Sequence, residues 1–91
     1  MLIKLRIKKS ELIWDKWNIK HIAKHIITKL EVEEVFVKPV RAKRSYKERL
    51  IDFGETKGKR LLAIVLEKEE KGYYVLSGRA ASRKERKDLL K

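Results

Sequence analysis

Six consecutive apolar residues, Leu61 to Leu66, constrain the fold of this 91-residue chain more than any other feature. A run without polar residues predicts a strand covered on both faces, because a half-exposed strand alternates apolar and polar side chains. We therefore place this run at the centre of a sheet. The flanking segments predict an antiparallel meander, with strands at 50–53 and 73–77, a hairpin loop at 54–59 and a charged loop at 67–72.

The segment before the meander predicts two helices. Asp15 is typical of a helix N-cap, and apolar residues recur at helical spacing from there to about His25. Thr28 and Glu31 form a capping-box pattern that starts a second helix, which Pro39 ends.

Two further strand patterns lie at the N-terminus. Residues 2–7 alternate apolar and basic side chains, and residues 12–14 either extend that strand or form a second short one. With a C-terminal helix from Ser82, the order is β-α-α-β-β-β-α. This predicts one α+β domain over residues 1–91, an antiparallel sheet with helices packed on one side.

The last fifteen residues carry the strongest functional pattern. Ser82 and Glu85 form a second capping box at the start of a helix, and Arg79 lies in the preceding strand-to-helix turn. With Arg83 in the first turn, guanidinium groups surround a helix N-terminus. Such an arrangement favours a phosphate.

The net charge of +12 favours a polyanionic partner. Solubility or an acidic protein partner would also explain the positive charge. Heat tolerance is a third explanation, because the chain lacks Gln and has one Asn and one Met, a composition typical of thermophiles. We expect RNA to contact basic residues in the middle of the chain and in the C-terminal helix: Arg41, Lys43, Arg44, Lys47, Arg49, Lys84 and Lys87.

Other classes are disfavoured. The absence of cysteine excludes disulfides and thiolate metal sites. No stretch approaches the roughly 20 apolar residues that span a bilayer, and the N-terminus does not read as a signal peptide, so we expect a cytoplasmic protein without membrane contact. His21 and His25 have the spacing of zincin ligands, but Ile22 replaces the catalytic Glu and no third ligand is evident. We expect no metal and no cofactor.

Metal-free RNA cleavage needs a base that takes the 2′-hydroxyl proton, positive charge that stabilises the phosphorane and an acid that protonates the leaving oxygen. Arg79 and Arg83 are suited to stabilise the phosphorane. His25 or Glu85 could be the base, and His25 could be the acid. Glu85 has a strong competing structural explanation in its capping box. The structural explanation of Arg79, a salt bridge to Asp52 or Glu55, is weaker.

Large aromatic side chains offer base stacking. Of Trp14, Trp17, Tyr73 and Tyr74, we expect Trp14 in the core and the two tyrosines on opposite faces of a strand.

These motifs resemble the BrnT family of bacterial toxins, small ribonucleases similar in fold to RelE. The resemblance runs from about Leu12 to Lys87 and rests on LIWDKWNIKHIAKH at 12–25, EEVFVKP at 33–39, ERLIDFGETKGKRLLAIVLE at 48–67 and SGRAASRKER at 77–86. Two positions depart from the family pattern. Ile26 replaces a usual Gly after Lys-His, which we expect to change the helix exit, and Gly78 replaces a usual Ala. Residues 1–9 are an N-terminal addition without a family role, and they would form an extra strand or pair at an edge between subunits.

The resemblance implies metal-independent RNA cleavage that arrests growth, with His25, Arg79, Arg83 and Glu85 as the carried-over site. It also implies a BrnA-like antitoxin that neutralises the toxin and binds DNA, and leaves open a homodimer or a toxin–antitoxin hetero-oligomer. Two rival interpretations remain. One is a non-catalytic RNA- or ribosome-binding module, and the other is a toxin relic that binds an antitoxin peptide at a sheet edge or apolar groove.

Overall fold

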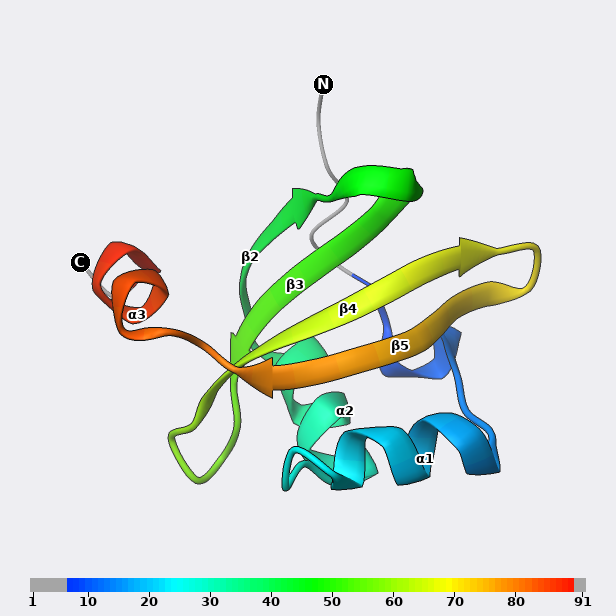
Figure 1. The fold of residues 1–91 in the computed structure, drawn as a ribbon, viewed down its shortest axis with the longest axis horizontal. Helices are drawn as coiled ribbons and strands as arrows, with labels where there is room; N and C mark the ends of the chain where they lie inside the picture. Colours follow the sequence, from blue (N-terminus) through cyan, green and yellow to red (C-terminus); the bar gives the residue numbers. More distant parts are fainter. Residues whose placement is uncertain (1–6, 90–91) are drawn as a thin grey trace.

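A computed structural model describes residues 7–89 of the chain (Figure 1). Its helices are α1 (Lys16–Ala23), α2 (Lys29–Val37) and α3 (Arg83–Leu89). Its strands are β1 (Leu12–Ile13), β2 (Pro39–Arg44), β3 (Arg49–Glu55), β4 (Leu61–Glu69) and β5 (Gly72–Ala80). Short 3-10 turns cover Lys9–Glu11 and Tyr46–Glu48. The strand predicted at residues 2–7 falls almost wholly outside the described residues.

The strands form one sheet in the order β1-β5-β4-β3-β2, with β4 at its centre as the apolar run predicted. The α+β class is confirmed, but two details differ. The sheet is mixed, because β1 pairs with β5 in parallel. The sequence also missed β2, whose residues we had read only as part of a basic stretch. This strand lies at the sheet edge and is largely exposed, so it lacks the apolar pattern that reveals a half-buried strand.

The hairpin between β4 and β5 is longer than the sequence predicted. The expected loop at 67–72 is wrong, because the strands pair out to Glu69 and Gly72 and leave only a tight turn. Charged side chains continue this ladder beyond the apolar core, and Lys68 Nζ lies 4.8 Å above the Tyr73 ring. At the other end, β5 runs to Ala80 instead of ending at Ser77, so Arg79 lies in a strand and not in a turn.

Helices α1 and α2 pack on the same side of the sheet, whereas α3 stands apart beyond the end of β5 (Figure 1). The core between α1, α2 and the sheet is mainly aliphatic and includes Ile22, Ile27, Val35, Leu62 and Ile64. Ile7 is also buried there, so the N-terminal addition contributes to the core. None of the residues of α3 is buried.

The turn between α1 and α2 uses an unusual residue. The N–H of Ile27 donates to the Ile22 carbonyl at 3.2 Å and that of Ile26 donates to the Ala23 carbonyl at 3.0 Å. This is the Schellman motif, completed by the buried pair Ile22 and Ile27. Ile26 therefore takes the left-handed conformation, with φ of 57°, that favours glycine. The expectation that Ile26 changes the helix exit is therefore wrong, because the turn keeps a glycine-type geometry with isoleucine in place.

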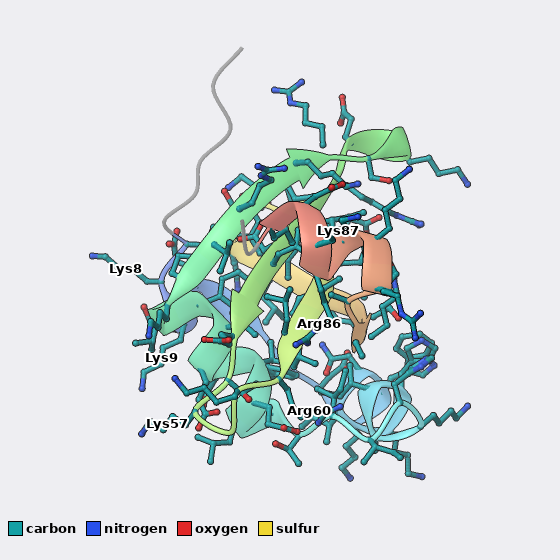
Figure 2. The ribbon with its side chains drawn as sticks, turned by 90° about the vertical axis from the view of Figure 1, so that its left-hand side faces the viewer. Lys8, Lys9, Lys57, Arg60, Arg86 and Lys87 are labelled. Atoms are coloured by element: carbon teal, nitrogen blue, oxygen red, sulfur yellow. The ribbon has the colours of Figure 1, made fainter. Side chains whose placement is uncertain are left out.

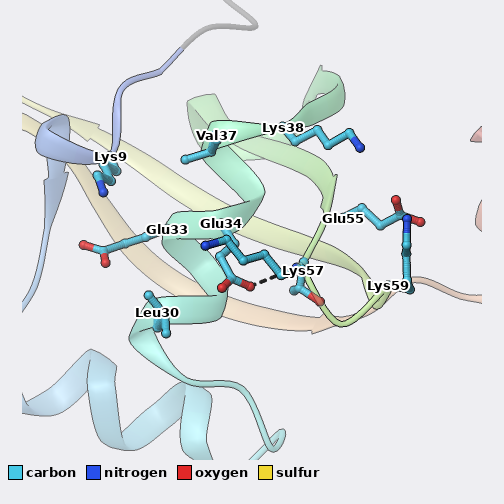
Figure 3. A pocket seen from close by; sticks show the side chains of 10 residues that line it. Lys9, Leu30, Glu33, Glu34, Val37, Lys38, Glu55, Lys57 and Lys59 are labelled. Atoms are coloured by element: carbon cyan, nitrogen blue, oxygen red, sulfur yellow. Dashed lines mark hydrogen bonds between the residues drawn. The ribbon is translucent and has the colours of Figure 1, made fainter.

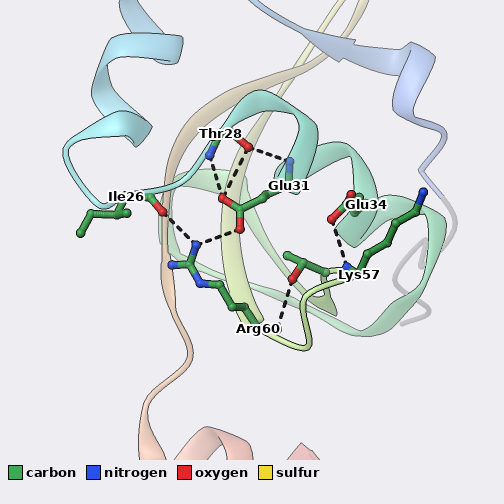
Figure 4. A network of polar contacts seen from close by, with 7 residues as sticks. Ile26, Thr28, Glu31, Glu34, Lys57 and Arg60 are labelled. Carbon is green, nitrogen blue, oxygen red and sulfur yellow. Dashed lines mark hydrogen bonds and ion pairs between the residues drawn. The ribbon is translucent and has the colours of Figure 1, made fainter.

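Arg60 fastens this turn to the loop between β3 and β4 (Figure 4). Its guanidinium Nη1 donates to the Ile26 carbonyl and to Glu31 Oε2, both at 2.9 Å. Glu31 in turn completes the predicted capping box with Thr28 at the start of α2. Next to this network, the Lys57 N–H donates to Glu34 Oε1 at 3.0 Å. One arginine thus joins α1, α2 and the hairpin loop.

Asp52 is an exception to the aliphatic core. It is fully buried on β3, with Ala42 and Ile64 as its cross-strand neighbours, and neither carboxyl oxygen has a hydrogen-bond partner. Burial raises the pKa of this carboxyl to about 7. Because the charged form is costly in such a site, the neutral acid is the better-tolerated species.

The variant Ile26→Gly should stabilise the fold by about 1 kcal/mol, because it relieves a left-handed β-branched residue. Little apolar burial is lost, since Ile26 is 81% exposed. Thermal unfolding should show a rise of several degrees. Ile26→Ala keeps a Cβ in the left-handed region and should gain much less, and equal gains for both variants would refute this explanation.

Stability should fall as pH rises through the range in which Asp52 ionises. The folded state retains a proton that the unfolded chain releases near pH 4, so the contribution of Asp52 is complete below about pH 4 and is lost by about pH 7. The pKa rise from 3.8 to about 7 corresponds to at most about 4 kcal/mol. Urea unfolding at pH 5 and pH 8 should show a difference that Asp52→Asn reduces. An unchanged difference would assign the pH dependence to other groups.

Candidate nucleic-acid interface

The sheet face turned away from α1 and α2, here called the outer face, carries a cross-strand row of basic and apolar residues. The register aligns Arg41 on β2 with Phe53 on β3, Ala63 on β4 and Arg79 on β5. Three strand spacings of about 4.8 Å place the two arginines roughly 14 Å apart in the backbone. Two guanidinium groups therefore flank a central strip in which Phe53 and Ala63 are buried.

A second row runs parallel to the first and contains a shallow hollow. It aligns Lys43, Ile51, Val65 and Ser77 across the same four strands. The hollow has a volume of about 380 Å³ and is lined by residues of β3, β4, β5 and the turn after β2: Ser45, Arg49, Ile51, Val65, Leu76 and Ser77. Its floor is apolar and its rim is basic and hydroxylic, which suits a ribose or base next to a phosphate.

Arg79 is held by a bidentate ion pair at the end of this face. Its Nη1 and Nη2 donate to Glu85 Oε1 and Oε2 at 2.7 and 3.0 Å. Glu85 Oε1 also accepts the Ser82 N–H at 2.8 Å, and Ser82 Oγ accepts the Glu85 N–H at 3.1 Å. The predicted capping box is therefore present, and the ion pair brings the first turn of α3 to the side of the sheet that Arg79 faces.

This geometry fixes the charge of Glu85. The hydrogen bond from Arg79 is the main cause that lowers the pKa of Glu85 to about 2. A carboxylate with this pKa is a weak proton acceptor at neutral pH. It also already occupies the N-terminus of α3, where we had expected a phosphate. The alternative partners Asp52 and Glu55 do not hold Arg79.

The exposed basic residues of α3 extend the positive surface of the outer face. Arg83, Lys84, Arg86 and Lys87 are all exposed. Figure 2 looks onto the side of the molecule from which α3 protrudes and shows Arg86 and Lys87 on that helix. Because α3 buries no residue, its first turn is tied to the sheet by the Arg79–Glu85 ion pair and not by apolar packing.

The structure brings together some of the predicted residues and separates others. The outer face carries four of the predicted basic residues: Arg41, Lys43, Arg49 and Arg79. Lys43 Nζ lies 5.7 Å from the Phe53 ring centroid. Arg44 pairs with Leu50, which packs against the core, and therefore lies on the opposite face. Lys47 lies in the β2–β3 turn with φ of 60°.

His25 lies away from this group, exposed in the turn after α1. A Cβ at Gly78 would lie 3.3 Å from Ile27 Cδ1, so Gly78 faces the α1–α2 turn. The next residue, Arg79, faces the other way. The catalytic pair predicted from the sequence is thus separated by the thickness of β5. The small side chain at 78 is also explained, because Ile27 and Ile64 fill the space beside it.

Helix α1 presents rings that the sequence analysis had not joined. The Trp17 and His21 rings stack with centroids 4.9 Å apart and an interplanar angle of 7°. His21 and His25 meet edge to face at 6.0 Å. Their i, i+4 spacing was the only signal, and we had weighed it for metal binding. Within residues 7–89, no group of three His, Cys, Asp or Glu residues could hold a metal ion.

The other aromatic predictions are largely confirmed. Tyr73 is buried, and Tyr74 lies on the opposite face and donates from its hydroxyl to Asp15 Oδ2 at 2.9 Å. Trp14 is partly buried against the core. Trp17, for which no placement was predicted from the sequence, has 58% of its surface exposed.

A second hollow lies between α2 and the β3–β4 loop, away from the outer face (Figure 3). It has a volume of about 350 Å³, and its lining combines Leu30 and Val37 with lysines and glutamates. Leu30 and Val37 are 64% and 68% exposed. This apolar surface is of the kind that the antitoxin-binding interpretation requires.

Comparison with known proteins supports the fold. The chain matches no protein-family model and no curated protein. It is similar to the crystal structure of the Brucella abortus ribonuclease toxin BrnT, with a TM-score of 0.64 and 27% sequence identity. The match covers 79% of this chain and 96% of that toxin. The chain therefore has a BrnT-like fold. Among the described residues, no helix is long and apolar enough to cross a membrane.

The capping box predicts how α3 responds to substitution. Ser82→Ala removes the hydroxyl that accepts the Glu85 N–H and should weaken α3 by about 1 kcal/mol. The melting temperature should barely change, because α3 buries no residue. Hydrogen exchange should accelerate at the α3 amides alone. A large fall in melting temperature would show that α3 is part of the cooperative core.

Proposed function

We propose that this chain is the toxin of a type II toxin–antitoxin system and cleaves RNA without a metal ion. The observation that carries the proposal is the BrnT-like fold combined with an outer face that aligns Arg79 with Arg41. RNA is the polyanion to which such a surface and a net charge of +12 are suited. Growth arrest and cytoplasmic action follow from the same proposal.

The proposed reaction is internal attack by a ribose 2′-oxygen on the adjacent phosphorus. The 2′-hydroxyl proton passes to a base, the new P–O bond gives a cyclic phosphate, the bond to the 5′-oxygen breaks, and the leaving oxygen takes up a proton. Arg79 and Arg83 stabilise the negative charge of the phosphorane. Glu85 holds the Arg79 guanidinium in place as a carboxylate, a positioning role that its low pKa favours over that of a base.

His25 remains the proposed proton-transfer residue. Since it lies on the opposite side of β5 from Arg79, the two side chains must reach the same phosphodiester around the end of this strand, one residue beyond Arg79. Arg41, Lys43, Arg49, Lys84 and Lys87 then bind phosphates on either side of the cleaved bond, with Arg44 and Lys47 at the periphery.

The proposed partner is a BrnA-like antitoxin. The hollow at Leu30 and Val37 is a suitable docking surface, because the two residues are seven apart on α2 and both are exposed. An antitoxin bound at this hollow would neutralise the toxin either from a distance or through an antitoxin segment that reaches the outer face.

A non-catalytic RNA- or ribosome-binding module is the second candidate. The specific observation in its favour is that Glu85 engages both terminal nitrogens of Arg79. A guanidinium paired in this way is electrostatically weaker toward a phosphate than a free one. Binding would then depend on the other basic residues and form no product.

Purified protein with single-stranded RNA in EDTA should yield fragments ending in a cyclic phosphate. Arg79→Ala should reduce the rate at least about 100-fold, since it removes a donor that acts on transition-state charge. Lys71→Ala is the matched control, because it removes one exposed charge at the β4–β5 turn. Salt-sensitive binding without product would favour the binding module. Equal cleavage by Arg79→Ala would show that the site lies elsewhere.

A further inference from the structure

Three rings on α1 and the turn that follows it form a surface that neither fold nor core explains. Trp17, His21 and His25 follow one another at i, i+4 spacing, and two of the three rings are stacked almost parallel. We call these three residues the ring stripe. A tryptophan 58% exposed on a helix loses contact area that the core would have given it. Its position therefore suggests a ligand.

The charges around the ring stripe indicate the chemistry of that ligand. Lys16, Lys20 and Lys24 have the same i, i+4 spacing and form the neighbouring row on the helix. Residues 16–30 contain no Asp or Glu. The nearest acidic residue on the N-terminal side, Asp15, is engaged in the N-cap of α1 and with the Tyr74 hydroxyl. From Lys16 to Leu30 the segment is therefore aromatic and cationic, and the Asp15 carboxylate is the negative charge at its N-terminal end.

We propose that the ring stripe is a stacking platform for single-stranded RNA. An unpaired base stacks on the free face of Trp17, and Lys20 and Lys24 contact the adjacent phosphates. Rings next to a row of cations are the usual means by which proteins bind unpaired strands, because every base has a π face. A base on Trp17 would extend the existing stack of Trp17 on His21.

The ring stripe lies where an RNA substrate bound to the outer face could reach it. This inference rests on the proposed function, in which the substrate is RNA. Helix α1 packs against β5, the strand that carries Arg79 on its other face. A strand of RNA bound to the outer face would therefore reach α1 after passing the end of β5. His25, the last ring of the stripe, is the proposed proton-transfer residue, so the platform would direct the RNA toward it.

Binding should be measured in EDTA with the Arg79→Ala background, in which we expect RNA cleavage to be at least about 100-fold slower. The probe is a ten-nucleotide oligo(A), compared with a ribose-phosphate chain of the same length without bases. Trp17→Leu, which keeps an apolar side chain, should weaken oligo(A) binding about 5-fold or more. Binding of the abasic chain should stay the same. Tryptophan fluorescence should be quenched by oligo(A) in the background protein and much less in the variant, in which Trp14 is the remaining tryptophan.

Ile19→Ala is the matched control, because Ile19 is 41% exposed on α1 but outside the ring stripe. It should bind both probes normally. If Trp17→Leu also binds oligo(A) normally, the inference is wrong, and a protein partner becomes the better explanation for the exposed ring. That result leaves the proposed ribonuclease intact if the parent still cleaves RNA. A parent that neither binds nor cleaves RNA would refute both.

Discussion

The fold depends on the need of β4 to be covered on both faces. Leu62, Ile64 and Leu66 face the core beneath α1 and α2. Leu61 and Ala63 face the other way and are also buried. On this second face Phe53 of β3 lies beside Ala63. The ladder continues past the end of β5, where the Ala81 N–H donates to the Leu61 carbonyl at 2.9 Å. The outer face is thus apolar along its middle by structural necessity, and its basic side chains are placed on the flanking strands.

That arrangement determines what the outer face can bind. Lysines and arginines on β2 and β5 flank an apolar strip, so a ligand with both negative charge and flat apolar surface fits better than a simple anion. The ion pair between Arg79 and Glu85 fixes the orientation of the Arg79 guanidinium. A free arginine would sample many rotamers, whereas a guanidinium held at two oxygens presents its remaining edge in one direction. The cost is a weaker local field, which the exposed cations of α3 offset through their proximity.

Much of the fold was predictable because it follows from short-range patterns. The central strand, both capping boxes and the class of fold all depend on residues that are close in sequence. The second strand was missed because its sequence, PVRAKR, lies at an exposed edge and is specified by pairing with β3. The end of β5 was misplaced for a similar reason, since Ser77, Gly78 and Arg79 have low strand preference and are held by the ladder with β4.

The candidate site was predictable in composition but not in arrangement. Arg79 and Glu85 were recognised as a motif, yet their pairing depends on a six-residue separation across a strand and a helix that no periodicity reports. The separation of His25 from Arg79 depends on the alternation of β5, which places Gly78 toward Ile27. Placing the end of β5 three residues too early, at Ser77 instead of Ala80, was enough to hide this separation. Side-chain direction in a strand changes with every residue, so a site on a strand is harder to derive than one on a helix.

The helix exit of α1 joins the stability of the fold to the surface proposed for RNA. Ile26 accepts a strained conformation at a position where glycine would be relaxed, and it does so between His25 and the buried Ile27. Arg60 holds the carbonyl of the same residue, so the turn is fixed from the sheet side as well. Strain that persists next to functional groups is tolerated where the surrounding contacts determine the backbone. Here those contacts fix the direction in which His25 leaves the helix, and they connect it through Arg60 to the hairpin that begins β4. The position of the histidine is therefore set by the sheet, even though the residue itself lies in a turn.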